Sequence, residues 1–204
     1  MYYPVLAVVL AIMLSGCTTQ GLKYLEAPEV LSVSGQYVHE SSGVMFPVTV
    51  GDFARSGISK FDQDAQDVGI SYQTADSAKY IKATVYVYPS PPLKSIGSPK
   101  SVIEEARAYL CDQEFEQTVQ FILNAQSDSS LIEKSGEVSS QAPHFLRVQY
   151  TGDFASVSLP LNSELEMSCY LNDKWNLKFR FTYPADLEIA PKLQEFKANF
   201  VKQF

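Results

Sequence analysis

The 204-residue sequence is poor in several residue types that carry chemistry. It has 2 histidines, 3 cysteines and 1 tryptophan, and its 16 Lys and Arg are outnumbered by 23 Asp and Glu. The net charge of −7 argues against a nucleic-acid binder and against a polybasic membrane patch, because both need clustered basic residues. A Gly-x-Ser-x-Gly elbow, a glycine-rich phosphate loop, a redox Cys-x-x-Cys and a zinc motif are also missing. No motif therefore predicts catalysis, a metal or a cofactor.

The apolar run near the N-terminus is too short to cross a membrane. It extends over Val5–Leu14 (VLAVVLAIML), and a helix of ten residues rises only about 15 Å, roughly half of the hydrocarbon core. Ten residues is instead the length of the hydrophobic region of a signal peptide. The preceding residues 1–4 contain no Lys or Arg, so either the terminal amine supplies the usual positive charge or the start lies upstream.

The motif Leu14-Ser15-Gly16-Cys17, directly after this run, resembles the lipobox of bacterial lipoproteins. The resemblance implies that signal peptidase II removes residues 1–16 and that Cys17 carries acyl chains such as palmitate on its sulfur and its amine. Several acyl chains give durable anchoring, where one gives only marginal binding. Thr18 takes the place of the aspartate that commonly signals inner-membrane retention, so the resemblance implies the periplasmic face of the outer membrane.

With Cys17 lipidated, Cys111 and Cys169 remain. An exported chain enters an oxidising compartment, so this even pair suggests a disulfide. Cys111 lies near the apolar stripe of an expected helix, and Cys169 shares a strand face with apolar residues, so both are expected to point into the core between helix and sheet. Two buried free thiols are the alternative.

Hydrophobic periodicity divides the chain into a tether and one domain. Residues 17–30 show no strong period and are expected to be a lipidated tether, while residues 31–204 are expected to form a single domain. Three- and four-residue spacing predicts helices at about 98–125 and 188–204. Period-two patterns and apolar runs predict strands at 33–38, 43–50, 53–61, 67–73, 79–88, 131–139, 144–150, 155–159, 164–171 and 175–183.

The order of strands, helix, strands, helix with short connections predicts an α+β fold, a largely antiparallel sheet with the helices packed on it. This succession over residues 31–204 resembles the Mog1/PsbP-like sandwich. The resemblance implies a non-enzymatic binding or assembly factor. Segments 43–53 and 86–89 also look like a stretch in uncharacterised bacterial lipoproteins, and that likeness supplies no function.

The two histidines and an acidic cluster are candidates for chemistry with plainer interpretations. His39 stands beside Glu40, Ser41 and Ser42, but neighbouring strand residues alternate faces, so we expect a surface or turn residue. His144 begins a strand and is expected to be a packed or edge histidine. An EF-hand needs glycine at position six and a carboxylate at position twelve, which the following acidic cluster does not provide, so a solvated hairpin turn is expected. The cluster consists of Asp62, Asp64, Gln66 and Asp67.

An aromatic group is the remaining candidate. Tyr80, Tyr86 and Tyr88 together with Trp175 could form a face for a glycan or a protein partner. Aromatic residues at period two are more often sheet residues covered by a helix.

These patterns predict a non-catalytic, membrane-anchored envelope lipoprotein, a binding or assembly module that acts through contacts with an envelope protein. Two alternatives stay open. One is an envelope hydrolase whose site is assembled from scattered residues, with His39 or His144 in a pocket. The other is a small-ligand carrier with a cavity between sheet and helix.

Overall fold

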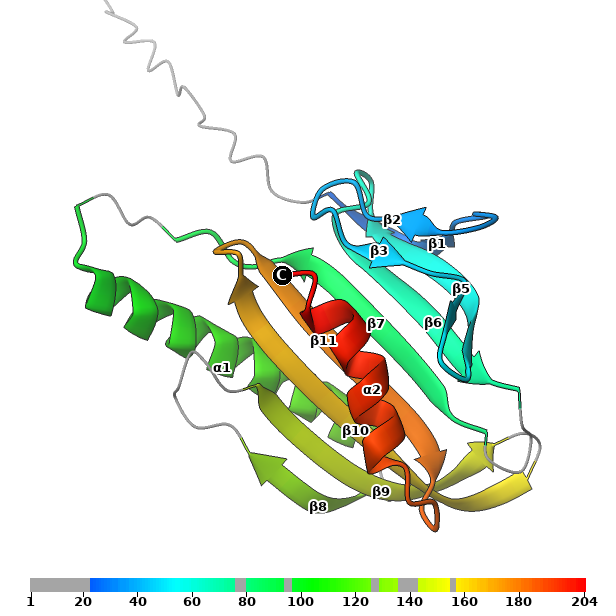
Figure 1. The fold of residues 1–204 in the computed structure, drawn as a ribbon. Coiled ribbons are helices and arrows are strands. Elements are labelled where there is room, and N and C mark those ends of the chain that lie inside the picture. The colour runs from blue at the N-terminus through cyan, green and yellow to red at the C-terminus, as the bar shows by residue number, and fades with distance from the viewer. Residues whose placement is uncertain (1–22, 76–79, 94–96, 126–128, 136–142, 155–156) are drawn as a thin grey trace, which may run out of the picture.

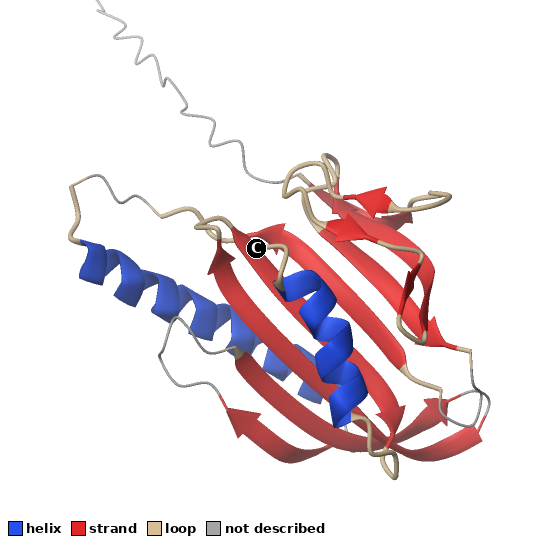
Figure 2. Ribbon diagram, viewed as in Figure 1, coloured by secondary structure: helices blue, strands red, loops and turns tan. Residues whose placement is uncertain are grey.

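Alternating apolar and polar residues build one large antiparallel sheet (Figure 2). The computed structural model describes residues 23–75, 80–93, 97–125, 129–135, 143–154 and 157–204. Within them, nine strands form this sheet in the order β1-β5-β6-β7-β11-β10-β9-β8, and β4 pairs with β5 beside that path. Every pairing in the sheet is antiparallel.

The elements agree closely with the expected order of strands, helix, strands, helix. The strands of the large sheet are β1 Tyr24–Val30, β4 Thr49–Val50, β5 Phe53–Asp62, β6 Val68–Thr74, β7 Lys82–Pro89, β8 Ser130–Ser135, β9 His144–Phe154, β10 Val157–Leu171 and β11 Trp175–Pro184. A separate small pair consists of β2 Tyr37–Val38 and β3 Met45–Phe46. The helices are α1 Lys100–Ala125 and α2 Ala190–Val201. The fold is therefore a mixture of α and β in which sheet predominates.

The two helices lie on opposite faces of the sheet (Figure 1). Residues directly opposite each other on antiparallel strands share a face, and the register pairs Met167 with Lys178 and Glu166 with Phe179. Met167 belongs to the apolar cluster under α1, whereas Phe179 belongs to the cluster under α2. Helix α1 thus covers β9 and β10 from one side, and α2 covers the β5–β7 and β11 half from the other.

The α2 side contains the larger core. Leu193, Phe196 and Phe200 are buried against the sheet, and the Phe196 ring lies 5.8 Å from the ring of Phe181. Burying each such side chain contributes about 1.5–3 kcal/mol. These residues are the apolar stripe expected for the last helix, so the core of this half follows from helical periodicity alone.

Helix α1 is held by a smaller cluster and by a cysteine pair. Phe115 and Val119 pack among residues of β9 and β10. The Sγ atoms of Cys111 and Cys169 lie 2.02 Å apart, at disulfide distance, and the two Cα atoms are separated by 5.9 Å. The fold thus brings together the two cysteines that were expected to pair, one on α1 and one on β10.

The expected tether is too long at its C-terminal end. Residues Tyr24–Val30 form β1, which extends the edge of the sheet by pairing Tyr24 with Asp62 and Val30 with Ser59. This strand is almost entirely exposed, contains Pro28 and has an irregular register, so it lacks the alternation that marks a half-buried strand. The domain therefore begins by residue 24 rather than at 31. The proposed signal peptide and Cys17 lie outside the described residues.

Candidate functional site

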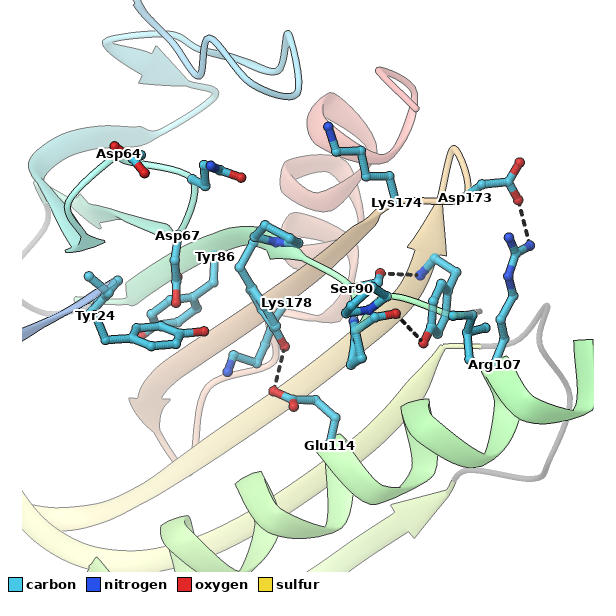
Figure 3. Close-up of a pocket in the computed structure, with 18 of the residues that line it drawn as sticks. Tyr24, Asp64, Asp67, Tyr86, Ser90, Arg107, Glu114, Asp173, Lys174 and Lys178 are labelled. Carbon is cyan, nitrogen blue, oxygen red and sulfur yellow. Dashed lines mark hydrogen bonds and ion pairs between the residues drawn. The ribbon is translucent and has the colours of Figure 1, made fainter. Parts of the chain in front are cut away.

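A cleft of about 1190 Å³ opens beside α1 on the half of the sheet that this helix leaves uncovered. Its floor comes from β7 and β11, and one wall is α1 (Figure 3). The opposite wall consists of the start of β1 and the turn between β5 and β6, and residues 89–93 line one end. The cleft exists because α1 and α2 lie over different halves of the sheet, so neither helix covers this half of the α1 face.

The floor is built on one row of residues that crosses four strands. The register pairs Met167 of β10 with Lys178 of β11, Lys178 with Tyr86 of β7, and Tyr86 with Gly69 of β6. Met167 is fully covered by α1, whereas Lys178 and Tyr86 line the cleft. Strand pairing alone therefore places the ammonium group of Lys178 next to the aromatic ring of Tyr86, beside α1.

Gly69 provides the space for this ring. A methyl group at its Cα would lie 3.0 Å from the Cε1 atom of Tyr86 and 3.1 Å from the Cε2 atom of Phe61. Both contacts are closer than side chains normally approach, so the missing side chain lets the two rings approach the backbone of β6. The aromatic floor depends on glycine at this point of the row.

Lys178 is held by aromatic rings instead of by an ion pair. Its Nζ atom lies 5.0 Å from the centroid of the Tyr86 ring and 5.1 Å from that of Tyr88. Within the described residues it makes neither an ion pair nor a hydrogen bond, so its three N–H donors remain available toward the cleft. Burial lowers the pKa of Lys178, and the nearby carboxylates of Glu114 and Asp67 act in the opposite direction.

Glu114 brings a carboxylate to the cleft from α1. The hydroxyl of Tyr88 donates a hydrogen bond of 3.1 Å to its Oε1 atom. This bond joins the helix to the floor and orients the carboxylate toward the same space as Lys178 (Figure 3). Burial, assisted by the charge of Glu114, raises the pKa of Tyr88 well above its usual range, so the hydroxyl remains a donor at neutral pH.

Asp67 supplies a second carboxylate from the opposite wall. Burial raises its pKa to about 6, an effect that the charge of Lys178 partly offsets. Its side chain has no hydrogen-bond or ion-pair partner in the part of the chain that the structure describes. Asp67 and Lys178 therefore face one cleft with opposite charges and do not pair.

The turn that carries Asp67 is fixed by Asp62, which corrects one expectation. The Oδ1 atom of Asp62 accepts hydrogen bonds from the backbone N–H groups of Gln66, at 2.8 Å, and of Asp67, at 3.2 Å. The cluster forms the hairpin turn between β5 and β6, as expected, and Asp64 is exposed, but Asp62 is fully buried and not solvated. A carboxylate that caps two amides positions the residue that lines the cleft.

The far end of the cleft is closed by groups that satisfy one another. Arg107 of α1 donates a hydrogen bond of 2.6 Å to Asp173, and its guanidinium lies 5.3 Å from the ring centroid of Tyr170. The Ser90 hydroxyl donates to the Oδ1 atom of Asn176 at 2.5 Å. Lys23, Asp64 and Lys174 also line the cleft but are exposed, so the partly buried charges without an ion pair among the described residues are those around Lys178 and Asp67.

A smaller hollow of about 250 Å³ beside α2 offers a useful contrast. The Nε atom of Arg147 donates to Glu164 at 2.8 Å, and Lys197 forms an ion pair with Glu166. Each of these four charges is matched by another that the fold supplies. Unpaired opposite charges are thus a property of the larger cleft and not of every hollow in this protein.

Both histidines have structural positions outside the cleft. His39 is fully buried, which corrects the expectation of a surface residue, although it does begin a turn. Its Nδ1 atom lies 2.6 Å from the Ser42 hydroxyl oxygen and its Nε2 atom 2.9 Å from the carbonyl oxygen of Ala65. Burial lowers the pKa of His39. Its ring is packed edge-on against Trp175 at 5.2 Å between centroids, so no substrate can reach it.

His144 is packed, as expected, and its ring lies against the cysteine pair. Its Nε2 atom lies 2.5 Å from the Oδ1 atom of Asp112, and its Nδ1 atom lies 3.7 Å from the Sγ atom of Cys111. The ring also contacts Phe115, with 5.0 Å between the ring centroids. His144 thus helps to join the start of β9 to α1.

The structure divides the aromatic group suggested by the sequence. Tyr86 and Tyr88 line the cleft, but Trp175 points to the other face and belongs to the α2 core. On the polar face of β11, Lys178 lines the cleft and Asn176 is buried. Alternation identified the face of Lys178 correctly, and no sequence signal placed α1 beside it. Asp67 and Glu114 were missed for the same reason.

The described part of the chain contains neither a membrane-spanning helix nor a metal-binding cluster. Neither helix there combines the length and hydropathy needed to cross a membrane. No group of three or more His, Cys, Asp and Glu side chains among those residues is arranged to hold a metal ion. Comparison of the chain with protein families, with curated proteins and with solved structures finds no match.

Proposed function

We propose that this chain is a lipid-anchored envelope lipoprotein that works as a non-catalytic binding module, with the cleft beside α1 as its binding site. The lipobox-like motif that ends at Cys17 supports the anchor. Thr18 supports the periplasmic face of the outer membrane. The element order of the domain supports a Mog1/PsbP-like arrangement, whose members tend to be binding or assembly factors.

The observation that carries the binding role is an ammonium, on the floor of a large cleft, that has no ion-pair or hydrogen-bond partner among the described residues. Lys178 is partly buried, and a charge in that position is costly unless something pairs with it. A few polar groups converging in an aromatic concavity are typical of ligand sites. The sequence alone favoured contacts with an envelope protein, and the cleft favours the alternative of a small-ligand carrier.

The position of β1 supports a site close to the membrane. Lys23 and Tyr24 line the cleft, and Lys23 is only the sixth residue after Cys17. A stretch of six residues spans at most about 20 Å. With lipid on Cys17, the mouth of the cleft lies within that distance of the bilayer surface.

The hydrolase alternative gains no support from the histidines. His39 is sealed in the core, and His144 contacts α1 and the cysteine pair, so neither lines the cleft. A nucleophile relay would need one of these rings within hydrogen-bond reach of an accessible substrate.

Photo-crosslinking in cells tests the binding site. A benzophenone amino acid replaces Tyr24 at the mouth of the cleft in one variant and Tyr109 of α1 in the other. The two side chains are equally accessible, 63% and 61% exposed, but only Tyr24 lines the cleft. We expect adducts, detected by mass spectrometry of the purified protein, at position 24 and not at 109. Equal adducts at both positions, or none at 24, would contradict the proposal.

The anchor is tested separately. The mature N-terminus is identified by mass spectrometry, and membrane partitioning is measured for the wild type and Cys17→Ser. We expect an acylated N-terminal Cys17 in the wild type and unprocessed chain in the variant. A mature protein that still begins at Met1 would remove the anchor from the proposal.

A further inference from the structure

We propose that the cleft binds a zwitterionic group, with the ligand's anion on Lys178 and its ammonium on Asp67 and Glu114, which is the chemistry of phosphoethanolamine. This inference rests on the proposed function, because it names the ligand class of the same cleft. It starts from the two opposite charges that face one space without forming an ion pair.

The fold keeps these charges apart. Lys178 is on β11 and Asp67 directly precedes β6, and the strand between them, β7, places Tyr86 in the row that runs from Lys178 to Gly69. The aromatic ring fixes the ammonium by cation–π contact. The Asp62 carboxylate fixes the backbone of Asp67 from the other side. The ammonium of Lys178 and the backbone that carries Asp67 are therefore preorganised for a ligand that bridges the two charges.

The balance of charge selects the ligand class. A simple anion would be attracted by Lys178 but repelled by Asp67 and Glu114. A simple cation would be attracted by the two carboxylates but repelled by Lys178. A group with an anion and an ammonium a few ångströms apart satisfies both ends at once. Arg107 and Asp173 already neutralise each other at the far end, so they add no net charge to this comparison.

The aromatic lining suits the cationic end of such a ligand. Tyr24 and Phe61 lie on the Asp67 side of the cleft, and Tyr24 is labelled next to Asp67 in Figure 3. Rings and carboxylates together are the usual surroundings of a bound ammonium. At the other end, the free N–H donors of Lys178 match the oxygens of a phosphate.

Titration calorimetry with O-phosphoethanolamine tests the inference on the native, lipidated protein in nanodiscs of phosphatidylglycerol, whose headgroup has no ammonium. Inorganic phosphate, ethanolamine and the dipeptide Ala-Ala are the comparison probes. We expect phosphoethanolamine to bind at least about tenfold more tightly than any of them. Tighter binding of phosphate alone or of the dipeptide would overturn the zwitterion assignment.

Two variants test where the anionic and the cationic ends of the ligand bind. Lys178→Met should weaken binding at least about tenfold, the loss expected for a charge-assisted hydrogen bond. Asp67→Asn should weaken it roughly fivefold while raising the affinity for phosphate, because the variant removes a charge that repels the anion. Lys202→Met is the matched control, because Lys202 is an exposed lysine at the end of α2. Phosphoethanolamine binding that is insensitive to both cleft variants would overturn the inference.

Proton release gives a readout that a merely structural role would not change. Lys178, Asp62 and Glu114 are the charged groups that act on Asp67, and an added ammonium should lower the pKa of Asp67 below its value of about 6. Calorimetry at pH 6 in two buffers of different ionisation enthalpy should detect more proton release in the wild type than in Asp67→Asn. The phosphate, whose second pKa is about 6, contributes to the release in both proteins. Equal proton release by both proteins would contradict binding of the ammonium at Asp67.

Two comparisons complete the test. One distinguishes a lipid headgroup from a free metabolite, and the other distinguishes failure of the ligand class from failure of the proposed binding site. Phosphatidylethanolamine in the disc should weaken the apparent binding of soluble phosphoethanolamine if the lipid fills the cleft, whereas an unchanged affinity assigns a free metabolite with the same chemistry. If Tyr24 is crosslinked in cells but phosphoethanolamine does not bind, the ligand class is wrong and the binding site stands. If Tyr24 gives no specific adduct, the binding site itself fails.

Discussion

The ammonium of Lys178 lies over the ring of Tyr86, 5.0 Å from its centroid, and has no ion-pair partner in the described part of the chain. Burial disfavours the charged form of a lysine, and its pKa is accordingly lowered. A chain selected only for stability gains nothing from such a group. The charge is better understood as one end of a binding site, and the following outcomes separate binding residues from structural ones.

Lys178→Met should leave the free energy of unfolding within about 1 kcal/mol of the wild type, or raise it. Methionine keeps an apolar stem of similar length and removes a desolvated charge, while the lost cation–π contacts are worth roughly 0.5–1 kcal/mol each. Urea denaturation at pH 7.5 measures the change, with Lys202→Met as the control. A loss above about 2 kcal/mol would show that Lys178 is structural.

Asp67→Asn should stabilise the protein at neutral pH. The folded-state pKa of about 6 is above the ordinary 3.8, so the folded chain holds the proton more tightly and Asp67 destabilises it once ionised. Two pKa units correspond to roughly 3 kcal/mol, which partial exposure reduces to about 1–2 kcal/mol.

The pH dependence of the difference in unfolding free energy between the wild type and Asp67→Asn tests whether the charge of Asp67 causes it. Urea denaturation of both proteins should give a gap that is widest above pH 6 and that closes as the pH falls from 6 toward 3.8. A gap independent of pH would mean that the charge of Asp67 is not its cause.

Removing the cysteine pair should loosen α1. A disulfide between Cys111 and Cys169 closes a separation of 58 residues, so the double change to alanine should cost about 2–4 kcal/mol. Thermal unfolding with and without reductant measures the loss, and electrophoretic mobility under the same two conditions reports the bond. Identical mobility together with two titratable thiols in the native protein would contradict the pairing.

Ser42→Ala should destabilise the protein by about 1–3 kcal/mol, although Ser42 does not line the cleft. Its hydroxyl is the partner of His39 Nδ1, and removing it leaves a polar atom of a fully buried ring unsatisfied. Chemical denaturation measures the cost. Ser41→Ala, the neighbouring exposed serine, is the matched control, and equal effects of the two changes would argue against this hydrogen bond.

The sequence predicted those elements that carry strong periodicity. The stripe Leu193, Phe196 and Phe200 identified α2, and the alternation Trp175, Leu177, Phe179 identified β11 with its correct inner face. Strand β1 was missed because it lies on an edge of the sheet with nearly all of its side chains exposed. Its sequence therefore lacks the alternation of apolar and polar residues that indicates a strand. Burial of His39 was missed because it depends on contacts with Ala65 and Trp175, which are distant in the chain.

The cleft could not be foreseen from periodicity. Its charged residues come from α1, from β11 and from the turn before β6, and only strand register and the offset of the two helices bring them together. Alternation placed Lys178 on the polar face of its strand. Whether that face meets water, a helix or a cleft depends on where α1 lies, which local sequence does not specify.

The most direct test of the cleft is nuclear magnetic resonance of the native protein with ¹³C-labelled tyrosine rings, titrated with O-phosphoethanolamine. Tyr24 and Tyr86 line the cleft, whereas Tyr109 is exposed outside it. We expect saturable shifts of the Tyr24 and Tyr86 resonances and an unchanged Tyr109, with the shifts lost in Lys178→Met. Unchanged Tyr24 and Tyr86 resonances at concentrations that saturate binding would contradict the cleft as the site.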